Sequence, residues 1–314
     1  MGKICFGIDI GGTTVKIGIL SEEGQILDKW EIKTRTEDNG AHIVSDIAES
    51  LKKAIAEKGY SMDDVIGAGM GVPGPVMADG TINRCVNLGW GVYNAAAELS
   101  GLLGVPVKAG NDANVAALGE QWMGGGKGYD NVVMITLGTG VGCGIILDGK
   151  ILAGTTGAAG ECGHMTIADP EDMIYTCGCG RHGCLETLTS ATGVVNIAKH
   201  LVETTDKATS LRDLSEITSK DIWDAAKAGD AGALEVVDKV AYYLGKAINT
   251  VAVVVNPEIF VIGGGVSKAG QFLIDKVVKS FKAQTFHAVE DTKIVLATLG
   301  NDAGMVGAAR LVLQ

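Results

Sequence analysis

A short glycine-rich stretch, Cys-Gly-Cys-Gly-Arg-His-Gly-Cys, brings together Cys177, Cys179 and Cys184. An upstream stretch, Gly-Glu-Cys-Gly-His, adds His164. Three thiolates and one imidazole form a Cys₃His set, the usual closed tetrahedral site for structural zinc. His182 and Cys162 lie close enough in the sequence to be rival ligands. Seven cysteines cannot all pair, so the clustering favours a metal site over a disulfide framework.

Carboxylates lie on either side of this cysteine cluster and once more near the middle of the chain. Glu161 precedes the cluster and Glu186 follows it. Carboxylates accept hydrogen bonds without donating, which suits sugar hydroxyls, and His164 could bind a metal with one ring nitrogen and a hydroxyl with the other. Asp112 follows Asn111 where an apolar-periodic helix is expected to begin. Such residues are ordinary helix N-caps, but a carboxylate there could also accept a hydroxyl proton during phosphoryl transfer.

Three glycine-rich turns each follow an apolar strand. The first contains Gly12 and Thr13 after Asp9, a carboxylate that could hold Mg²⁺ through water. The second is Gly138-Thr139-Gly140, and the third contains Gly264 and Gly265. Each could be an ordinary turn or a phosphate-binding loop. The G-x-x-x-x-G-K-[ST] motif is absent, and the one G-x-G-x-x-G match, at residues 69–74, is followed by proline and is interpreted as coincidental.

The elements around these turns alternate in the manner of an α/β protein. Strands are expected at 3–10, 15–20, 26–33, 65–72, 105–109, 131–137, 143–147, 258–262 and 293–297, and helices at 41–58, 93–103, 112–122, 234–255, 270–283 and 302–313. Residues 192–232 are polar and helical, as in an insertion. The stretches IDIGGTTVKIGIL and ITLGTGVGCGIIL share a pattern that indicates an internal duplication. Two similar halves would leave a ligand cleft between them.

The composition excludes several classes of protein. The net charge is −11 over 314 residues, which argues against non-specific binding to nucleic acid or to an anionic membrane. We expect neither a membrane-spanning helix nor a signal peptide, so a cytoplasmic location is the default. Glycine accounts for 46 residues, which suggests many turns that approach a ligand closely.

Together these segments resemble the ROK sugar kinases of the actin-like ATPase superfamily. DIGGTTVK and LGTGVGCG resemble the two phosphate loops of that family, IGGGVS its adenosine loop and GNDAN its catalytic segment; GECGHM with CGCGRHGCLE resembles its signature. The resemblance implies an α/β fold with two ribonuclease-H-like domains and an interdomain cleft. Residues 1–110 with 301–314 would form a small N-terminal domain. Residues 111–300 would form a larger domain with the zinc loop and the helical insertion.

The resemblance also implies a function and a set of site residues. The reaction would be ATP-dependent phosphorylation of a hexose, with glucose favoured, at its 6-hydroxyl. Asp112 would be the general base, and the sugar would contact Asn111, Asp112, Glu161, His164 and Glu186. The nucleotide would bind at Gly12, Thr13, Gly138, Thr139, Gly140, Gly264 and Gly265. Asp9 would associate with Mg²⁺ through water, and zinc would be held by His164, Cys177, Cys179 and Cys184. A homodimer or homotetramer is expected.

Two alternatives stay open. An N-acetylmannosamine kinase, or a kinase for another hexose, would use the same residues. A non-catalytic sugar sensor belongs to a different class, because some members of the family are repressors with an N-terminal helix-turn-helix domain. We do not expect such a domain here, because the first phosphate loop begins at residue 9, and the net charge of −11 also argues against DNA binding.

Overall fold

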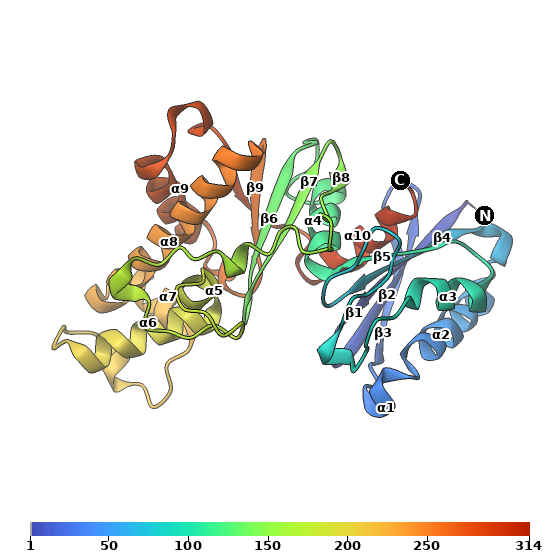
Figure 1. Ribbon diagram of the computed structural model, residues 1–314, viewed down its shortest axis with the longest axis horizontal. Coiled ribbons are helices and arrows are strands. Elements are labelled where there is room, and N and C mark those ends of the chain that lie inside the picture. Colours follow the sequence, from blue (N-terminus) through green and yellow to red (C-terminus); the bar gives the residue numbers. More distant parts are fainter. Residues whose placement is uncertain (1) are drawn as a thin grey trace. The chain divides into compact units, whose positions relative to one another are not determined.

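The computed structural model of the protein describes residues 2–314, which form two compact units. The first unit contains the described residues up to Asp130 together with Gly144–Gly160 and Thr298–Gln314. The second contains Asn131–Cys143 and Glu161–Ala297. Each unit is built mainly on one of the two sheets (Figure 1). None of the helices within residues 2–314 has the length and apolar composition needed to cross a membrane.

The first sheet has the strand order β3-β2-β1-β4-β5. Its strands are β1 (Ile4–Ile10), β2 (Thr14–Ser21), β3 (Ile26–Lys33), β4 (Val65–Val72) and β5 (Val107–Asn111). β1 is antiparallel to β2 and parallel to β4, and β4 is parallel to β5. Asp9, in the central strand, therefore lies between Lys16 on β2 and Gly71 on β4. β5 extends to Asn111, two residues beyond the strand expected from the sequence, because Gly110 and Asn111 still pair with β4.

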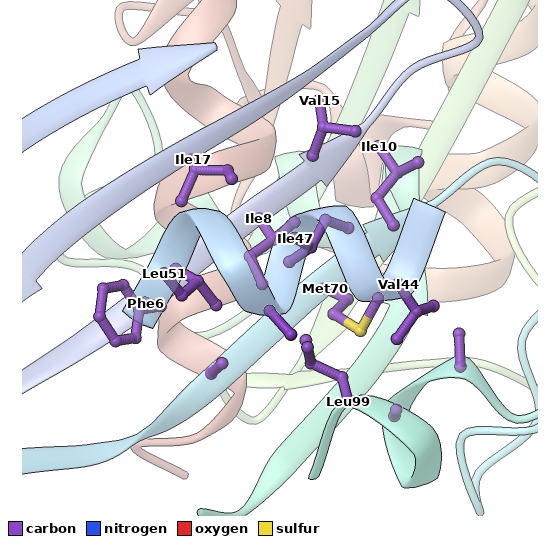
Figure 2. Close-up of a cluster of buried hydrophobic side chains, with 14 of the residues drawn as sticks. Phe6, Ile8, Ile10, Val15, Ile17, Val44, Ile47, Leu51, Met70 and Leu99 are labelled. Atoms are coloured by element: carbon purple, nitrogen blue, oxygen red, sulfur yellow. The ribbon is translucent and has the colours of Figure 1, made fainter. Parts of the chain in front are cut away.

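One face of this sheet is covered by α2 (Ile43–Lys58) and α3 (Ala95–Leu103). Side chains alternate across a strand, so Phe6, Ile8 and Ile10 all point to the same face. Figure 2 shows these side chains packed against Ile47 and Leu51 of α2. The apolar period of 41–58 therefore predicts the helix and its buried face. A short helix, α1 (Glu37–Gly40), lies just before α2 in the chain.

The opposite face is covered by α10 (Ala303–Leu311), which also packs on α4 (Asp112–Met123). Glycines permit this packing. A Cβ at Gly69 would lie 1.7 Å from the carbonyl oxygen of Ala308, and one at Gly307 would lie 1.6 Å from that of Val115. The glycine abundance is therefore explained only partly by ligand loops, because many glycines let backbone approach backbone in the core. Gly69 begins the coincidental G-x-G-x-x-G match and lies inside β4, where no helix follows directly.

The second sheet has the order β10-β9-β6-β7-β8. Its strands are β6 (Val132–Leu137), β7 (Val141–Leu147), β8 (Lys150–Ile151), β9 (Ile259–Gly263) and β10 (Lys293–Leu296). Numbered in chain order within each sheet, both sheets have the order 3-2-1-4-5. The two glycine turns of the repeated sequence pattern occupy equivalent places, between the first and second strands of each sheet. This shared topology supports the internal duplication.

The helices of the second unit are α5 (Glu186–Thr189), α6 (Ala191–Thr204), α7 (Ser219–Lys227), α8 (Ala231–Val255) and α9 (Gln271–Gln284). The segment 192–232 is helical as expected, and its helices belong to the packed second unit. Val194 of α6 and Trp223 of α7 are buried, and both helices pack on α8. The polar residues that suggested an insertion lie on the outer faces of these helices.

Candidate functional site

The first glycine turn joins β1 to β2 and is held from outside by Thr34. The Thr34 hydroxyl donates to the Gly11 carbonyl at 2.7 Å, and the Thr34 amide donates to the Thr13 carbonyl at 2.9 Å. Gly12 and Thr13 are exposed at the tip of the turn. The turn is thus fixed through its carbonyls while its tip faces outward. The sequence patterns did not identify Thr34, because it follows β3 and belongs to no motif.

Asp9 lies at the end of β1, directly before this turn. Burial raises the pKa of its carboxyl to about 6, against the opposing effect of Lys16, and Asp112 raises it further. Part of that burial comes from α10, since a Cβ at Gly304 would lie 2.8 Å from the Asp9 Cγ. A carboxylate in such surroundings is stabilised by a nearby cation. The Asp9 carboxylate therefore suits a divalent cation that is held through water. The sequence patterns did not identify Gly304.

Asn111 and Asp112 lie where β5 ends and α4 begins. The Asn111 Oδ1 accepts from the Asn114 amide at 3.1 Å and so caps the helix. Its Nδ2 donates to the Gly74 carbonyl at 3.1 Å and to the Asp112 Oδ1 at 3.0 Å. Asp112 is exposed, and it lies at the positive end of the α4 dipole. This arrangement can present a carboxylate to a polar ligand.

The second and third glycine turns lie against each other. Gly264 has φ +84°, and a Cβ there would come within 2.6 Å of the Leu137 backbone, which immediately precedes Gly138. The Gly138 carbonyl accepts from the Ala191 amide at 2.8 Å, at the start of α6. Thr139 is exposed, and nothing within 4 Å would meet a Cβ at Gly265. Both turns therefore expose backbone at neighbouring strand ends.

The cysteine cluster has the dimensions of a tetrahedral metal site. The ligand atoms of His164, Cys177, Cys179 and Cys184 all lie within 4.8 Å of one another. The Cys179 and Cys184 sulfurs are 3.7 Å apart, and the Cys177 sulfur is 3.6 Å from the His164 Nδ1. Zinc bond lengths of about 2.3 Å to sulfur and 2.0 Å to nitrogen give tetrahedral edges of about 3.8 Å between two sulfurs and about 3.5 Å between sulfur and nitrogen. The residues therefore fit zinc, and the His164 Nε2 is left for another partner.

The two rival ligands lie outside this group. The Cys162 thiol interacts instead with the Cys143 thiol, and both side chains are buried. His182 is exposed and is not one of the residues whose ligand atoms converge. Among the described residues, the geometry thus assembles the Cys₃His set.

The two glutamates of the signature are placed differently. The Glu186 Oε2 accepts from the Val141 amide at 3.0 Å, and its Oε1 accepts from the Cys177 thiol at 3.6 Å. A Cβ at Gly140 would lie 2.3 Å from Glu186 Oε2, so this glycine leaves room for the carboxylate. Glu161 is exposed, and its carbonyl accepts from the His164 amide at 3.0 Å. The second unit therefore brings together the second glycine turn, both glutamates and the metal ligands.

Known proteins resemble this chain over nearly its whole length. A model of the ROK family matches residues 5–314. A glucokinase of Halalkalibacterium halodurans is 47% identical over 313 residues, which cover 98% of this chain and 94% of the relative. The crystal structure of a ROK family glucokinase from Streptomyces griseus in complex with glucose and AMPPNP is 34% identical, with a TM-score of 0.75 and 98% of each chain covered. A ROK family transcriptional regulator, a homologue of the E. coli MLC protein, has a TM-score of 0.85 at 26% identity over 100% of this chain and 79% of its own.

Proposed function

This chain belongs to the ROK family, and on that premise we propose that it is a sugar kinase that transfers the γ-phosphoryl group of ATP to the 6-hydroxyl of glucose. The observation that carries the proposal is Asp112, an exposed carboxylate that is hydrogen-bonded by Asn111 at the start of α4. A base in that position can accept the hydroxyl proton as the oxygen attacks phosphorus. The similarity to glucokinases over 98% of the chain supports glucose as the acceptor.

The glycine turns would hold the nucleotide. Gly12 and Thr13 in the first unit, and Gly138, Thr139 and Gly140 in the second, would donate backbone and hydroxyl hydrogen bonds to the phosphates. Gly264 and Gly265 would border the adenosine. Asp9 would hold Mg²⁺ through water; the ion would neutralise charge on the transferred phosphoryl group. Phosphoryl transfer depends mainly on such positioning and charge neutralisation, so no covalent intermediate on the protein is needed.

The sugar would be bound by Asn111, Asp112, Glu161, His164 and Glu186. The His164 Nδ1 faces Cys177, which leaves Nε2 to donate to a sugar hydroxyl. Zinc on His164, Cys177, Cys179 and Cys184 would have a structural role, since four protein ligands leave no open position. By fixing the loop, this site would orient His164 and Glu186 toward the hydroxyls.

Other parts of the proposal concern the protein as a whole. The proposed functional division into residues 1–110 with 301–314 and residues 111–300 differs from the two compact units, which assign α4 to the first unit. A homodimer or homotetramer is proposed, and light scattering of the purified protein would check it. A cytoplasmic location is proposed because the substrate ATP is intracellular and the seven cysteines are unpaired, as in a reducing compartment.

The decisive experiment is ADP release with a panel of hexoses, with and without Mg²⁺. We expect turnover with glucose to exceed turnover with mannose, fructose, allose and N-acetylmannosamine. Preference for N-acetylmannosamine or another hexose would keep the mechanism and change the substrate. Sugar binding without any turnover would support a sugar sensor, a role suggested by the similarity to a ROK transcriptional regulator.

A further inference from the structure

The side-chain amide of Asn111 has almost no hydrogen-bonding capacity left for a ligand. A primary amide has two N–H donors and one oxygen with two lone pairs. The two donors are directed to the Gly74 carbonyl at 3.1 Å and to the Asp112 Oδ1 at 3.0 Å. The oxygen accepts from the Asn114 amide at 3.1 Å, which leaves one lone pair. Asn111 therefore bridges the segment that follows β4, the start of α4 and the carboxylate beside it.

The Gly74 carbonyl that receives one of these bonds is itself held in place. Gly74 has φ +104°, and a Cβ at this position would lie 2.8 Å from the Arg84 carbonyl oxygen. The Asn83 amide donates to the neighbouring Pro75 carbonyl at 3.0 Å. The acceptor for Asn111 is thus part of a backbone segment packed against residues 83 and 84. A fixed acceptor on one side restricts the Asn111 amide. This amide restricts the Asp112 carboxylate together with the Ala113 amide, which donates to the same Oδ1 at 2.8 Å.

We propose that Asn111 is a positioning residue for Asp112: its bridging amide holds the carboxylate in the orientation in which it accepts the sugar hydroxyl proton. This inference rests on the proposed kinase activity and deepens it. It gives Asn111 a role that acts through another residue, beyond direct contact with the sugar. A misplaced base is costly, because a shift of about 1 Å at a reacting group can reduce the rate about 100-fold.

The substitution Asn111→Asp separates this role from the two simpler ones. Aspartate caps a helix as well as asparagine does, so a role in capping alone predicts no change. Aspartate also keeps the acceptor oxygen, so a sugar contact through that oxygen would persist. The introduced carboxylate has no N–H donors, and its oxygens would face the Gly74 carbonyl oxygen and the Asp112 Oδ1, which they repel. The positioning role therefore predicts a fall in kcat. We expect kcat to fall about 10- to 100-fold, with the glucose Kd by calorimetry within about threefold of the wild-type value.

A second variant and a matched control complete the design. Asn111→Ser retains a capping oxygen without adding charge, and it should also lower kcat. Asn94 caps α3 in the same way: its oxygen accepts from the Ala97 amide at 2.9 Å and its Nδ2 donates to the Asp79 carbonyl at 3.3 Å. The Asn94→Asp protein should therefore keep the wild-type kcat. Any change in its Tm would measure the effect of replacing a capping asparagine by aspartate.

Three results would overturn the inference. A wild-type kcat in Asn111→Asp would mean that Asn111 acts only as the helix cap of α4. A weaker glucose Kd with kcat unchanged would make it a sugar ligand only. A loss in Asn111→Asp but none in Asn111→Ser would assign the effect to the added charge. Failure of the proposed function differs from failure of this inference, because in the first case the wild-type protein itself would turn over no sugar.

Discussion

Asp9 and Asp112 are two carboxylates of the same unit in different surroundings. Asp9 lies at the end of a central strand, where burial raises its pKa to about 6. Asp112 is exposed at the first turn of α4 and receives a hydrogen bond from Asn111. Carboxylates in different environments can perform different roles in one site. This difference agrees with the proposed division, in which Asp9 associates with a cation and Asp112 accepts a proton.

Replacing Asp112 by asparagine tests the proposed base. The introduced amide would keep the shape and a hydrogen-bonding oxygen but could not accept a proton. We expect Asp112→Asn to lower kcat by about 10²–10⁴-fold, with glucose binding retained. Steady-state ADP release and calorimetry would measure the two quantities. Wild-type turnover in this variant would contradict the proposed role of Asp112.

The cluster of Cys177, Cys179, Cys184 and His164 predicts a bound metal. Removing one ligand leaves a site that can no longer close around zinc, so metal affinity and folding stability should fall together. We expect Cys179→Ser to contain less zinc by elemental analysis and to melt at a lower temperature than the wild type. Cys85→Ser controls for the zinc content alone, because Cys85 lies outside the cluster and is buried in the core, where a serine would itself lower stability. A wild-type protein purified without zinc would refute the metal site.

Among the elements, the start of α8 shows how a helix is fixed within the second unit. The Asp230 carboxylate accepts from the Ala233 amide at 2.9 Å, the Ser210 amide at 2.6 Å and the Thr209 hydroxyl at 2.7 Å. Burial opposes ionisation of this group, but these hydrogen bonds prevail and hold its pKa at about 2. Asp230 therefore joins the segment before α7 to the long helix.

This carboxylate makes the stability of the protein depend on pH in a defined direction. Its pKa is lower in the folded state than the value of about 3.9 in an unfolded chain. Its contribution is therefore present above about pH 4 and is lost as the pH falls from about 4 to 2. We estimate about 1–2 kcal/mol, reduced for partial solvent screening. Denaturant unfolding should show wild-type stability falling toward that of Asp230→Asn over this range, and a constant difference would contradict the assignment.

Most elements could be predicted from the sequence because their apolar period is strong. The range expected for β4 is the observed one, and the helices at 41–58 and 112–122 were placed within about two residues at each end. The sequence is least informative where tertiary packing decides which residues are buried. The polar character of 192–232 hid the apolar faces of α6 and α7. Nothing in the sequence signals that Glu120 is fully buried and accepts from the Thr298 and Leu299 amides.

Some residues of the candidate site could be predicted from the sequence and others could not, again because tertiary packing places the others. Residues in dense motifs, such as Cys177 and Cys184, could be assigned because ligand type and spacing limit the possible chemistry. Supporting residues could not, because Thr34, Gly74 and Gly304 reach the site only through the fold. Sequence spacing alone left His182 and Cys162 as alternatives to His164, and only the distances between ligand atoms separate them.

Considered as a whole molecule, the chain contains two sheets of the same strand order. Asp9, Asn111 and Asp112 belong to the first unit, and Glu186 and the metal ligands belong to the second. A ligand that binds only the folded protein raises its stability according to its affinity. Ligand-dependent unfolding therefore reports binding independently of turnover.

We expect glucose to stabilise the whole protein even when catalysis is removed. At about 100 times its Kd, glucose should raise the free energy of unfolding by about 2.7 kcal/mol. Asp112→Asn should show a similar shift, because it retains the sugar site. A hexose that is not turned over by the wild type provides the control in thermal melts. The absence of any shift with glucose would contradict glucose as the ligand.

The position of α10 also has a consequence for the order of events during synthesis. β1 is made long before α10, yet Gly304 lies against Asp9 and the α10 backbone fills the space beside Gly69. Until the residues of α10 have left the ribosome, one face of the first sheet is uncovered and the surroundings of Asp9 are incomplete. A growing chain therefore cannot acquire the finished carboxylate environment before α10 has been synthesised. A message truncated before the codon for Ala303 would yield a sheet with an exposed apolar face, a substrate for chaperones and proteases.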